Sequence, residues 1–184
     1  MALAALLSLS DTAASWAQAS RSLEYQVKAA FLFRFAQFVD WPPDTFPGAE
    51  TPLNFCVIGK DPFRGVLETT LAGKKVGTHA ARVLHVDKIL QAQGCHLLFV
   101  GEDFSVHLPE LIASLHNSAI VTIGDADRFA EQGGMIGFFW EDEKIRFDIN
   151  LEAAEKTKLR ISARLLSLAR TVIGGSKGAV NAVS

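Results

Sequence analysis

Two cysteines are the most reactive side chains of this 184-residue chain, and their spacing restricts what they can do. Cys56 and Cys95 are 39 positions apart, and the chain has no third cysteine. Zinc sites and thioredoxin-type exchange use cysteines at C-x-x-C spacing, which is absent here. The pair therefore predicts one disulfide bond. The alternative is two buried free thiols that pack as small hydrophobic side chains.

Motifs for nucleophilic, metal or phosphate chemistry fail on their context. Residues 174–178 read G-x-S-x-G, but no histidine follows His116 to complete a hydrolase triad. No glycine pattern for binding nucleotide phosphates follows a predicted strand. The sequence thus predicts no cofactor, no metal and no enzymatic activity. None of the histidines stands at metal-ligand spacing, and all are expected on the surface or at sheet edges: His79, His85, His96, His107 and His116.

Polar side chains near strand ends offer two further candidates. Asp125 and Asp127 follow a predicted strand at the edge where α/β sheets often place function, with helix capping by Asp127 as the simpler interpretation. Arg160 and Arg164 begin the last predicted helix within reach of Asn150. These three residues are candidates for a small-ligand pocket, and the alternative is that both arginines are simply solvated.

Composition excludes several classes of protein. The chain is 49% apolar and 21% charged, with a net charge of −2, which suits a single folded domain and rules out disorder. The balanced charge and the absence of Lys/Arg runs argue against nucleic acid or an anionic membrane surface as a partner.

The N-terminal segment differs from the rest of the chain. Residues 2–9 are a short apolar run, and residues 17–19 read Ala-Gln-Ala, a small-x-small cleavage pattern. Although a basic n-region is missing, we expect a signal peptide over residues 1–19, cleavage after Ala19 and export to the periplasm. Residues 20–184 then form a single domain with a loose tail over 174–184. The alternative is an amphipathic N-terminal helix in a cytosolic protein.

Hydrophobic periodicity predicts an α/β fold. Strands and helices alternate between residues 53 and 123, which favours a mainly parallel, twisted sheet of about five to six strands with helices on both faces. Residues 135–140 and 145–150 are expected to form an antiparallel hairpin on the sheet edge. The other strands are predicted at 53–58, 83–86, 97–100 and 119–123, and helices at 22–39, 61–71, 89–93, 104–115, 151–157 and from 162 through Val172.

The helix predicted over residues 22–39 is apolar on two sides. Phe31, Phe35 and Phe38 fall near one face, and a second apolar series lies opposite. Such a helix is either buried on more than one side or shows one side to a partner. The three phenylalanines are therefore candidates for dimer or partner contact, with core packing as an equal alternative.

Several segments carry a resemblance to a known family. They are residues 25–42, 55–59 with 61–63, 129–136, 145–151 and 159–169, which include F-C-V-I-G at 55–59 and L-R-I-S-A-R-L-L-S-L-A at 159–169. In these segments the chain resembles the YfiR family. The resemblance implies a periplasmic regulator that binds the periplasmic domain of a membrane diguanylate cyclase or sensor kinase. It further implies a homodimer and an outer-membrane lipoprotein as a second partner.

The resemblance also bears on single residues. Cys56 and Cys95 match the first cysteine pair of the family, and Arg160 falls in a basic segment near its small-ligand pocket. A second cysteine pair, expected between residues 133 and 139, is missing here, which favours a structural disulfide over a redox switch. The hypothesis is a non-enzymatic repressor that lowers cyclic-di-GMP output. The alternative is a periplasmic module that binds a small ligand or a cell-wall fragment.

Overall fold

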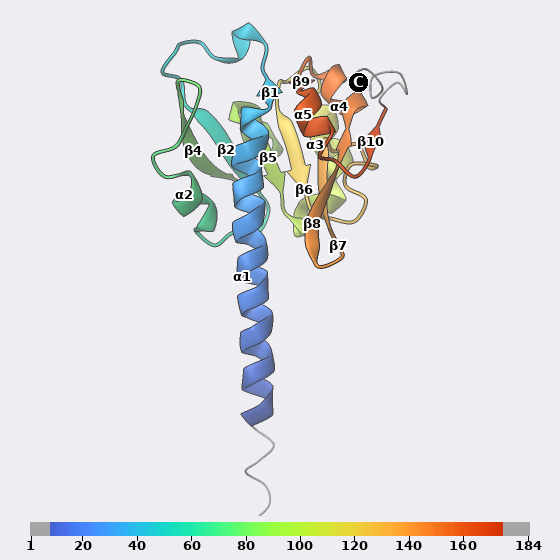
Figure 1. The fold of residues 1–184 in the computed structure, drawn as a ribbon. Coiled ribbons are helices and arrows are strands. Elements are labelled where there is room, and N and C mark those ends of the chain that lie inside the picture. The colour runs from blue at the N-terminus through green and yellow to red at the C-terminus, as the bar shows by residue number, and fades with distance from the viewer. Residues whose placement is uncertain (1–7, 175–184) are drawn as a thin grey trace, which may run out of the picture.

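An eight-stranded sheet forms the centre of the computed structural model, which describes the backbone of residues 8–174 and the side chains of residues 20–174 (Figure 1). Along the sheet the strand order is β10-β8-β7-β6-β5-β2-β4-β3. The strands are β2 (Leu53–Ile58), β3 (Lys75–Val76), β4 (His79–Val86), β5 (Leu97–Val100), β6 (Val121–Gly124), β7 (Ile136–Glu141), β8 (Lys144–Asn150) and β10 (Val172–Ile173). The first seven residues of the expected signal peptide and residues 175–184 of the expected tail lie outside the described residues.

The pairing of the strands confirms a mainly parallel sheet. β2 pairs in parallel with both β4 and β5, and β5, β6 and β7 continue the parallel series. β7 and β8 form the predicted antiparallel hairpin, whose turn residues Asp142 and Glu143 have φ values of 49° and 59°. The sheet has more strands than predicted, because β3 and β10 are only two residues long and too short to give a periodic signal.

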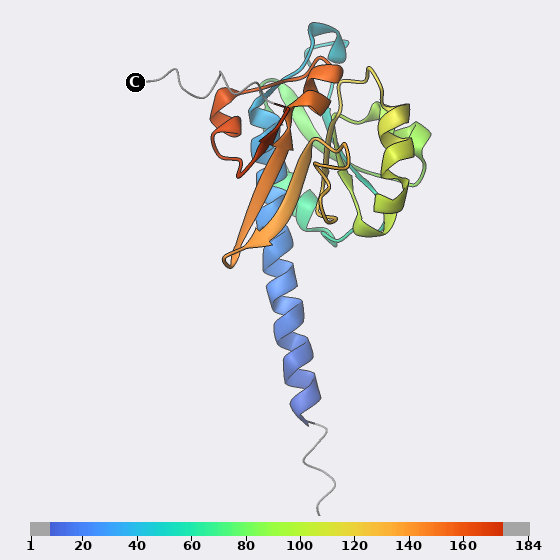
Figure 2. The same cartoon turned by 90° about the vertical axis from the view of Figure 1, so that its right-hand side faces the viewer.

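Helices cover both faces of the sheet, as predicted (Figure 2). α1 (Ser8–Gln37) and α2 (Val66–Leu71) pack on one face, and α3 (Leu108–Ser114) packs on the other. The N-terminal part of α1 extends beyond the domain (Figure 1). Short helices complete the fold: η1 (Pro43–Thr45), η2 (Ile89–Gly94), η3 (Glu102–His107), α4 (Leu151–Lys156) and α5 (Ala163–Leu166). β1 (Val39–Asp40) and β9 (Arg160–Ile161) form a separate antiparallel pair.

Strand alternation divides the core into two layers. Phe55 and Val57 on β2 face the α1 layer, whereas Cys56 and Ile58 face the α3 layer. Because both faces of β2 and β5 are covered, these strands read as continuous apolar runs, and the predicted bounds agree with the structure.

A disulfide joins Cys56 to Cys95, as predicted, with the two Cα atoms 5.8 Å apart. Cys56 lies on β2. Cys95 is the first residue after η2 and precedes β5, so it does not lie on a strand. Both side chains are buried in the α3 layer. The bond therefore links two neighbouring parts of the sheet on the face opposite α1.

Several predicted elements were wrong in their extent. The helix expected from residue 61 begins only at Val66, because Arg64 and Gly65 take φ values of 52° and 86°. The last helix is capped by Ser162 as predicted but ends at Leu166, and Val172 joins β10 outside β8, so the hairpin is not the sheet edge.

No helix follows Asp127, because Arg128 has a φ of 53°. The capping role proposed for Asp127 is therefore wrong. Among the described helices, none is both long enough and apolar enough to cross a membrane.

Candidate functional site

The outward side of α1 carries an apolar stripe, here called the α1 stripe: Leu23, Val27, Phe31 and Phe38. Leu23 is 62% exposed and Val27 is 39% exposed, and both phenylalanines are partly buried. The spacing of three to four residues between neighbouring turns places such side chains on one side of a helix. Trp140, two residues after the core residue Phe138 on β7, is 60% exposed on the same side of the sheet.

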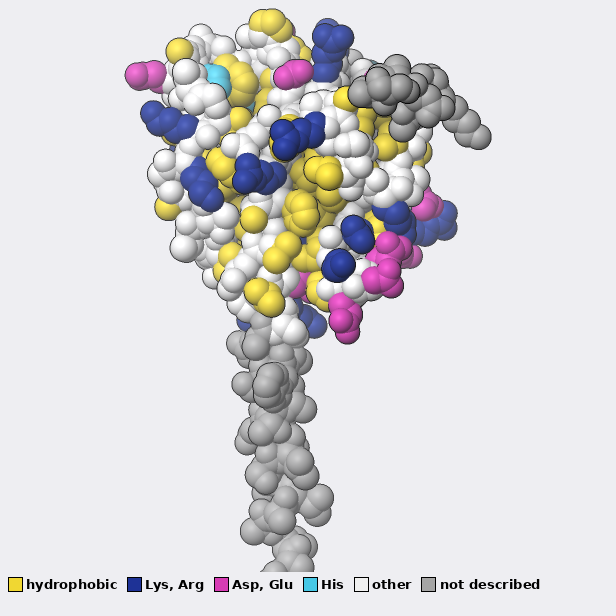
Figure 3. Space-filling model, viewed as in Figure 1, with side chains coloured by type: hydrophobic (Ala, Val, Ile, Leu, Met, Phe, Trp, Pro, Cys, Tyr) yellow, Lys and Arg dark blue, Asp and Glu magenta, His cyan; other side chains and the backbone are white. Residues whose placement is uncertain are grey.

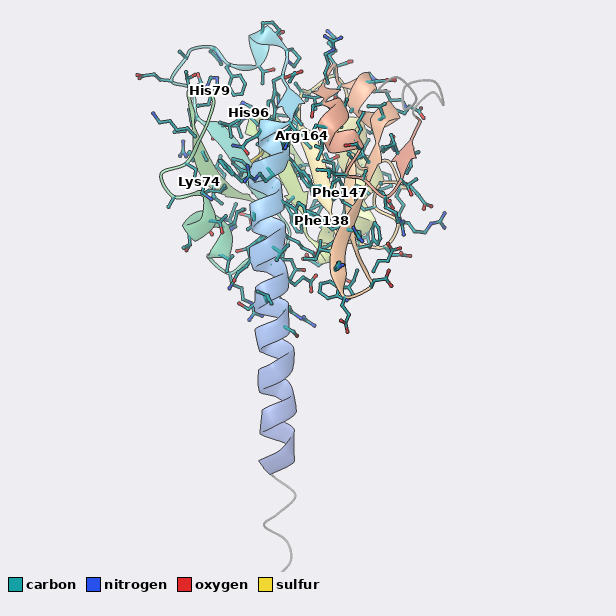
Figure 4. All side chains as sticks on the ribbon, in the orientation of Figure 1. Lys74, His79, His96, Phe138, Phe147 and Arg164 are labelled. Carbon is teal, nitrogen blue, oxygen red and sulfur yellow. A yellow bond between two sulfur atoms is a disulfide. The ribbon has the colours of Figure 1, made fainter. Side chains whose placement is uncertain are left out.

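The other sides of α1 hold the helix on the sheet. Phe35 is completely buried, and its ring lies 5.0 Å from that of Phe147 and 5.6 Å from that of Phe138. Phe31 contacts the same two rings from the border of the stripe. Figure 4 shows Phe138 and Phe147 beside α1. Of the three phenylalanines predicted to contact a partner, the structure thus places Phe35 in the core and leaves Phe31 and Phe38 partly accessible.

Cationic side chains lie against two sides of α1, and one of them, Arg164, flanks the α1 stripe. The Arg164 guanidinium lies 5.5 Å from the centre of the Phe38 ring, and Lys74 Nζ lies 4.8 Å from the Phe33 ring on another side of α1. Figure 3 shows hydrophobic side chains along α1 with lysine and arginine side chains around them. A surface with an apolar centre and a charged rim suits a protein partner.

The structure does not gather Asn150, Arg160 and Arg164 around one cavity. Asn150 is buried: its Oδ1 accepts from Ala153 N at 2.9 Å, which caps α4, and its Nδ2 donates to the Ala130 carbonyl at 2.9 Å. Asn150 lines a cavity of about 350 Å³ whose apolar residues include Leu115 and Met135. Neither arginine lines that cavity, because Arg160 is exposed on β9 and Arg164 lies over Phe38.

A histidine pair that the sequence did not reveal holds the loop after β1. The Phe46 ring stacks between His79 at 3.9 Å and His96 at 4.7 Å (labelled in Figure 4). His96 Nδ1 accepts from Asn54 N at 3.0 Å. Burial, and then the neighbouring His79, lower the pKa of His96. His96 is only 7% exposed, so the prediction of a surface or edge position was wrong for this residue.

Asp125 is the strand-end candidate that the structure supports. Lys28 on α1 is 4% exposed, and its Nζ lies 2.6 Å from Asp125 Oδ2 and 2.5 Å from Glu24 Oε1. The Tyr25 hydroxyl donates to the same Asp125 oxygen at 2.8 Å. Burial and Asp125 together raise the pKa of Tyr25 above its usual value. The period of α1 predicted its faces, but nothing local indicated this long-range ion pair.

Within the described residues, no group of three or more His, Cys, Asp or Glu side chains is arranged to hold a metal ion. The geometry supplies an exposed apolar stripe on α1 and a cavity lined by the buried Asn150.

A family model described as YfiR/HmsC-like matches residues 25–170, a range that includes α1 from Tyr25 onward and both cysteines. The chain belongs to the YfiR/HmsC-like family. Membership implies a periplasmic regulator of a diguanylate cyclase. The Phe-rich segment of α1 and the segment that carries Arg160 and Arg164 both fall inside the matched range.

Comparison with other proteins adds little to this assignment. A search of curated proteins finds no match. Among solved structures, the ABC domain in complex with L-Trp from Streptococcus pneumonia has a TM-score of 0.48 and 12% sequence identity. The aligned region covers 66% of this chain and 55% of that chain.

Proposed function

We propose that this chain is a non-enzymatic periplasmic repressor that binds the periplasmic sensor domain of an inner-membrane diguanylate cyclase and lowers cyclic-di-GMP output. Family membership supports the kind of partner. The observation that carries the site is the α1 stripe, where Leu23 and Val27 remain exposed although the opposite side of α1 is buried.

Repression then works through the conformational equilibrium of the partner. A sensor domain with an active and an inactive arrangement shifts toward the one that this chain binds more tightly. Docking on the α1 stripe would bury Leu23 and Val27 and leave the flanking Arg164 at the rim. The repressor is expected to be a homodimer, and the α1 stripe is a candidate for its dimer contact as well. An outer-membrane lipoprotein that sequesters the chain by covering the stripe would relieve repression.

Export supports the same proposal. Residues 1–19 act as a signal peptide that is cleaved after Ala19, and residues 20–184 form the mature domain. Disulfides persist in oxidising compartments such as the periplasm, which fits the Cys56–Cys95 bond. Mass spectrometry of the exported protein tests this, since cleavage and one disulfide give a mass about two units below that of reduced residues 20–184. A retained Met1 with free thiols would contradict it.

The function is tested by deleting the gene and measuring cellular cyclic-di-GMP. Deletion is expected to raise the nucleotide, and complementation to restore it. In parallel, the purified chain is immobilised and exposed to the purified periplasmic domain of each membrane diguanylate cyclase and sensor kinase of the same cell. Unchanged cyclic-di-GMP after deletion, together with no captured domain, refutes the proposal.

The cavity lined by Asn150 supports a second candidate function, binding of a small ligand or a cell-wall fragment. Its apolar lining and its rim of Glu131, Glu152 and Lys156 suit a ligand with both apolar and polar parts. Thermal shift with nucleotides, aromatic amino acids and muropeptides tests it. Lys156→Ala should reduce any shift, and Arg160→Ala, which lies outside the cavity, should not.

A further inference from the structure

A second polar cavity of about 590 Å³ lies at the carboxyl ends of the parallel strands. Lys60 follows β2, Glu102 follows β5 and Asp125 follows β6, and α1 closes the cavity from the side with Arg21 and Lys28. From β2 the chain moves to β4 on one side, then returns to β5 on the other side of β2. Open α/β sheets bind ligands outside the carboxyl ends of their strands at such a reversal.

Ion pairs and a hydrogen bond hold the buried side chains of this cavity in place. Lys28 is held between Glu24 and Asp125, and Tyr25 donates to Asp125. Buried charges are retained only where partners satisfy them, so these groups are committed to one another.

The other acidic side chains are mostly committed as well. Asp61 accepts from the backbone N–H groups of Phe63 and Arg64, at 2.8 Å and 3.1 Å. Both carboxylate oxygens of Asp103 accept from Lys60 N, at 2.9 Å and 3.1 Å. Glu102 is exposed and is the exception.

The cations at the mouth of the cavity have no such partners. Arg21, Lys60 and Arg64 are exposed, and none of their side chains makes a hydrogen bond or ion pair with another described residue. Three uncommitted cations therefore face one uncommitted carboxylate. Asp61 and Asp103 keep their negative charges, because backbone N–H groups do not neutralise a carboxylate. The positive side of the cavity is therefore the one with Arg21 and Arg64, since the adjoining cavity is lined by these two arginines and by no carboxylate.

An apolar wall adjoins these cations. A neighbouring cavity of about 360 Å³ shares Arg21, Tyr25, Pro62 and Arg64 with the first and adds Phe63 and Val66. Guanidinium groups bind phosphate and carboxylate groups through paired hydrogen bonds. An anion held between Arg21 and Arg64 would thus have an aromatic and aliphatic surface beside it.

We propose that this double cavity binds a small organic anion, whose phosphate or carboxylate group is held by Arg21, Lys60 and Arg64 and whose apolar body lies against Tyr25 and Pro62. This site is separate from the α1 stripe and from the cavity lined by Asn150. A failure of this proposal would therefore leave the proposed repressor function untouched, and a failure of the repressor function would leave this site untouched.

Isothermal titration calorimetry on the purified chain tests the site with three probes: phenyl phosphate, phenylacetate and inorganic phosphate. At least one aromatic anion is expected to bind at a single site with a Kd of about 1 mM or tighter, and inorganic phosphate at least about tenfold more weakly. Phenyl phosphate and phenylacetate distinguish the two anionic groups. Backbone amide signals of Lys60 and Gly101 should shift in NMR spectra on binding.

The matched variants are Lys60→Gln/Arg64→Gln, which removes two mouth cations, and Arg82→Gln, which removes an exposed arginine of β4 that lines neither cavity. The double variant should melt like the wild type, because neither side chain has a partner to lose, and should bind at least about tenfold more weakly. Arg82→Gln should bind normally. The absence of binding by both aromatic anions overturns the proposal, and so does unchanged affinity in a folded double variant.

Discussion

Reduction of the Cys56–Cys95 bond should lower the stability of the domain by an amount that the fold allows us to work out. The bond closes a loop with a sequence separation of 39 residues. In the chain-entropy treatment, a loop of this length stabilises the folded state by about 4 kcal/mol at 25 °C. For a domain of this size, each kcal/mol changes Tm by roughly 2–4 °C, so reduction should lower Tm by roughly 8–16 °C.

The assay compares the same protein in two redox states. Thermal unfolding followed by circular dichroism is recorded for the oxidised wild type, the reduced wild type and the Cys56→Ala/Cys95→Ala variant. The reduced wild type is the closest control, because it keeps both buried sulfur atoms. A drop in Tm of less than about 3 °C would refute the reasoning, since the bond would then not constrain the unfolded chain.

The same comparison separates a structural bond from a redox switch. The bond lies in the α3 layer, on the face of the sheet opposite α1. Reduced protein that is still folded should therefore capture the partner domain with an affinity within about twofold of the oxidised form. A loss of binding on reduction below the Tm would show that the bond regulates the α1 stripe.

Three further perturbations have expected outcomes. Asp125→Asn should cost about 3 kcal/mol in urea unfolding, because it leaves Lys28 buried with one carboxylate, and Lys28→Met in the same chain should recover most of that loss. Because the pKa of His96 is lowered in the folded state, the unfolded chain binds a proton at this side chain more readily than the folded chain does. The contribution of His96 to the free energy of unfolding should therefore be complete above pH 6.5, its ordinary pKa, and should decrease as the pH falls below that value. His96→Asn should flatten that dependence, and an unchanged slope would contradict the assignment. Asn150→Ala should cost about 2 kcal/mol in the same assay, because it removes the cap of α4 and leaves the Ala130 carbonyl with only the longer hydrogen bond from Gly133 N, at 3.3 Å.

The sequence predicted the elements whose signal is local. The runs at residues 53–58 and 97–100 are apolar throughout because both faces of β2 and β5 are covered, and the alternation at 145–150 gave the hairpin strand. The start of α2 could not be predicted from local signals, because Arg64 takes a left-handed backbone conformation that is uncommon for arginine.

Sites assembled from distant residues were harder to predict. Lys28 and Asp125 are 97 positions apart, and only the carboxyl-end position of Asp125 hinted at its role. Likewise, His79 and His96 meet only because Phe46 lies between them. The two apolar sides of α1 were visible in its periodicity, but only the packing showed that Phe35 is buried while Val27 remains accessible.

The most direct test of the α1 stripe as the repressive surface uses two matched substitutions in cells. Leu23 on the stripe is 62% exposed, and Leu90 on η2, in the opposite layer, is 76% exposed. Leu23→Glu should raise cellular cyclic-di-GMP to the level of the deletion strain while the amount of exported protein stays normal, and Leu90→Glu should repress like the wild type. Full repression by Leu23→Glu, or equal loss of repression in both variants, would contradict the central claim.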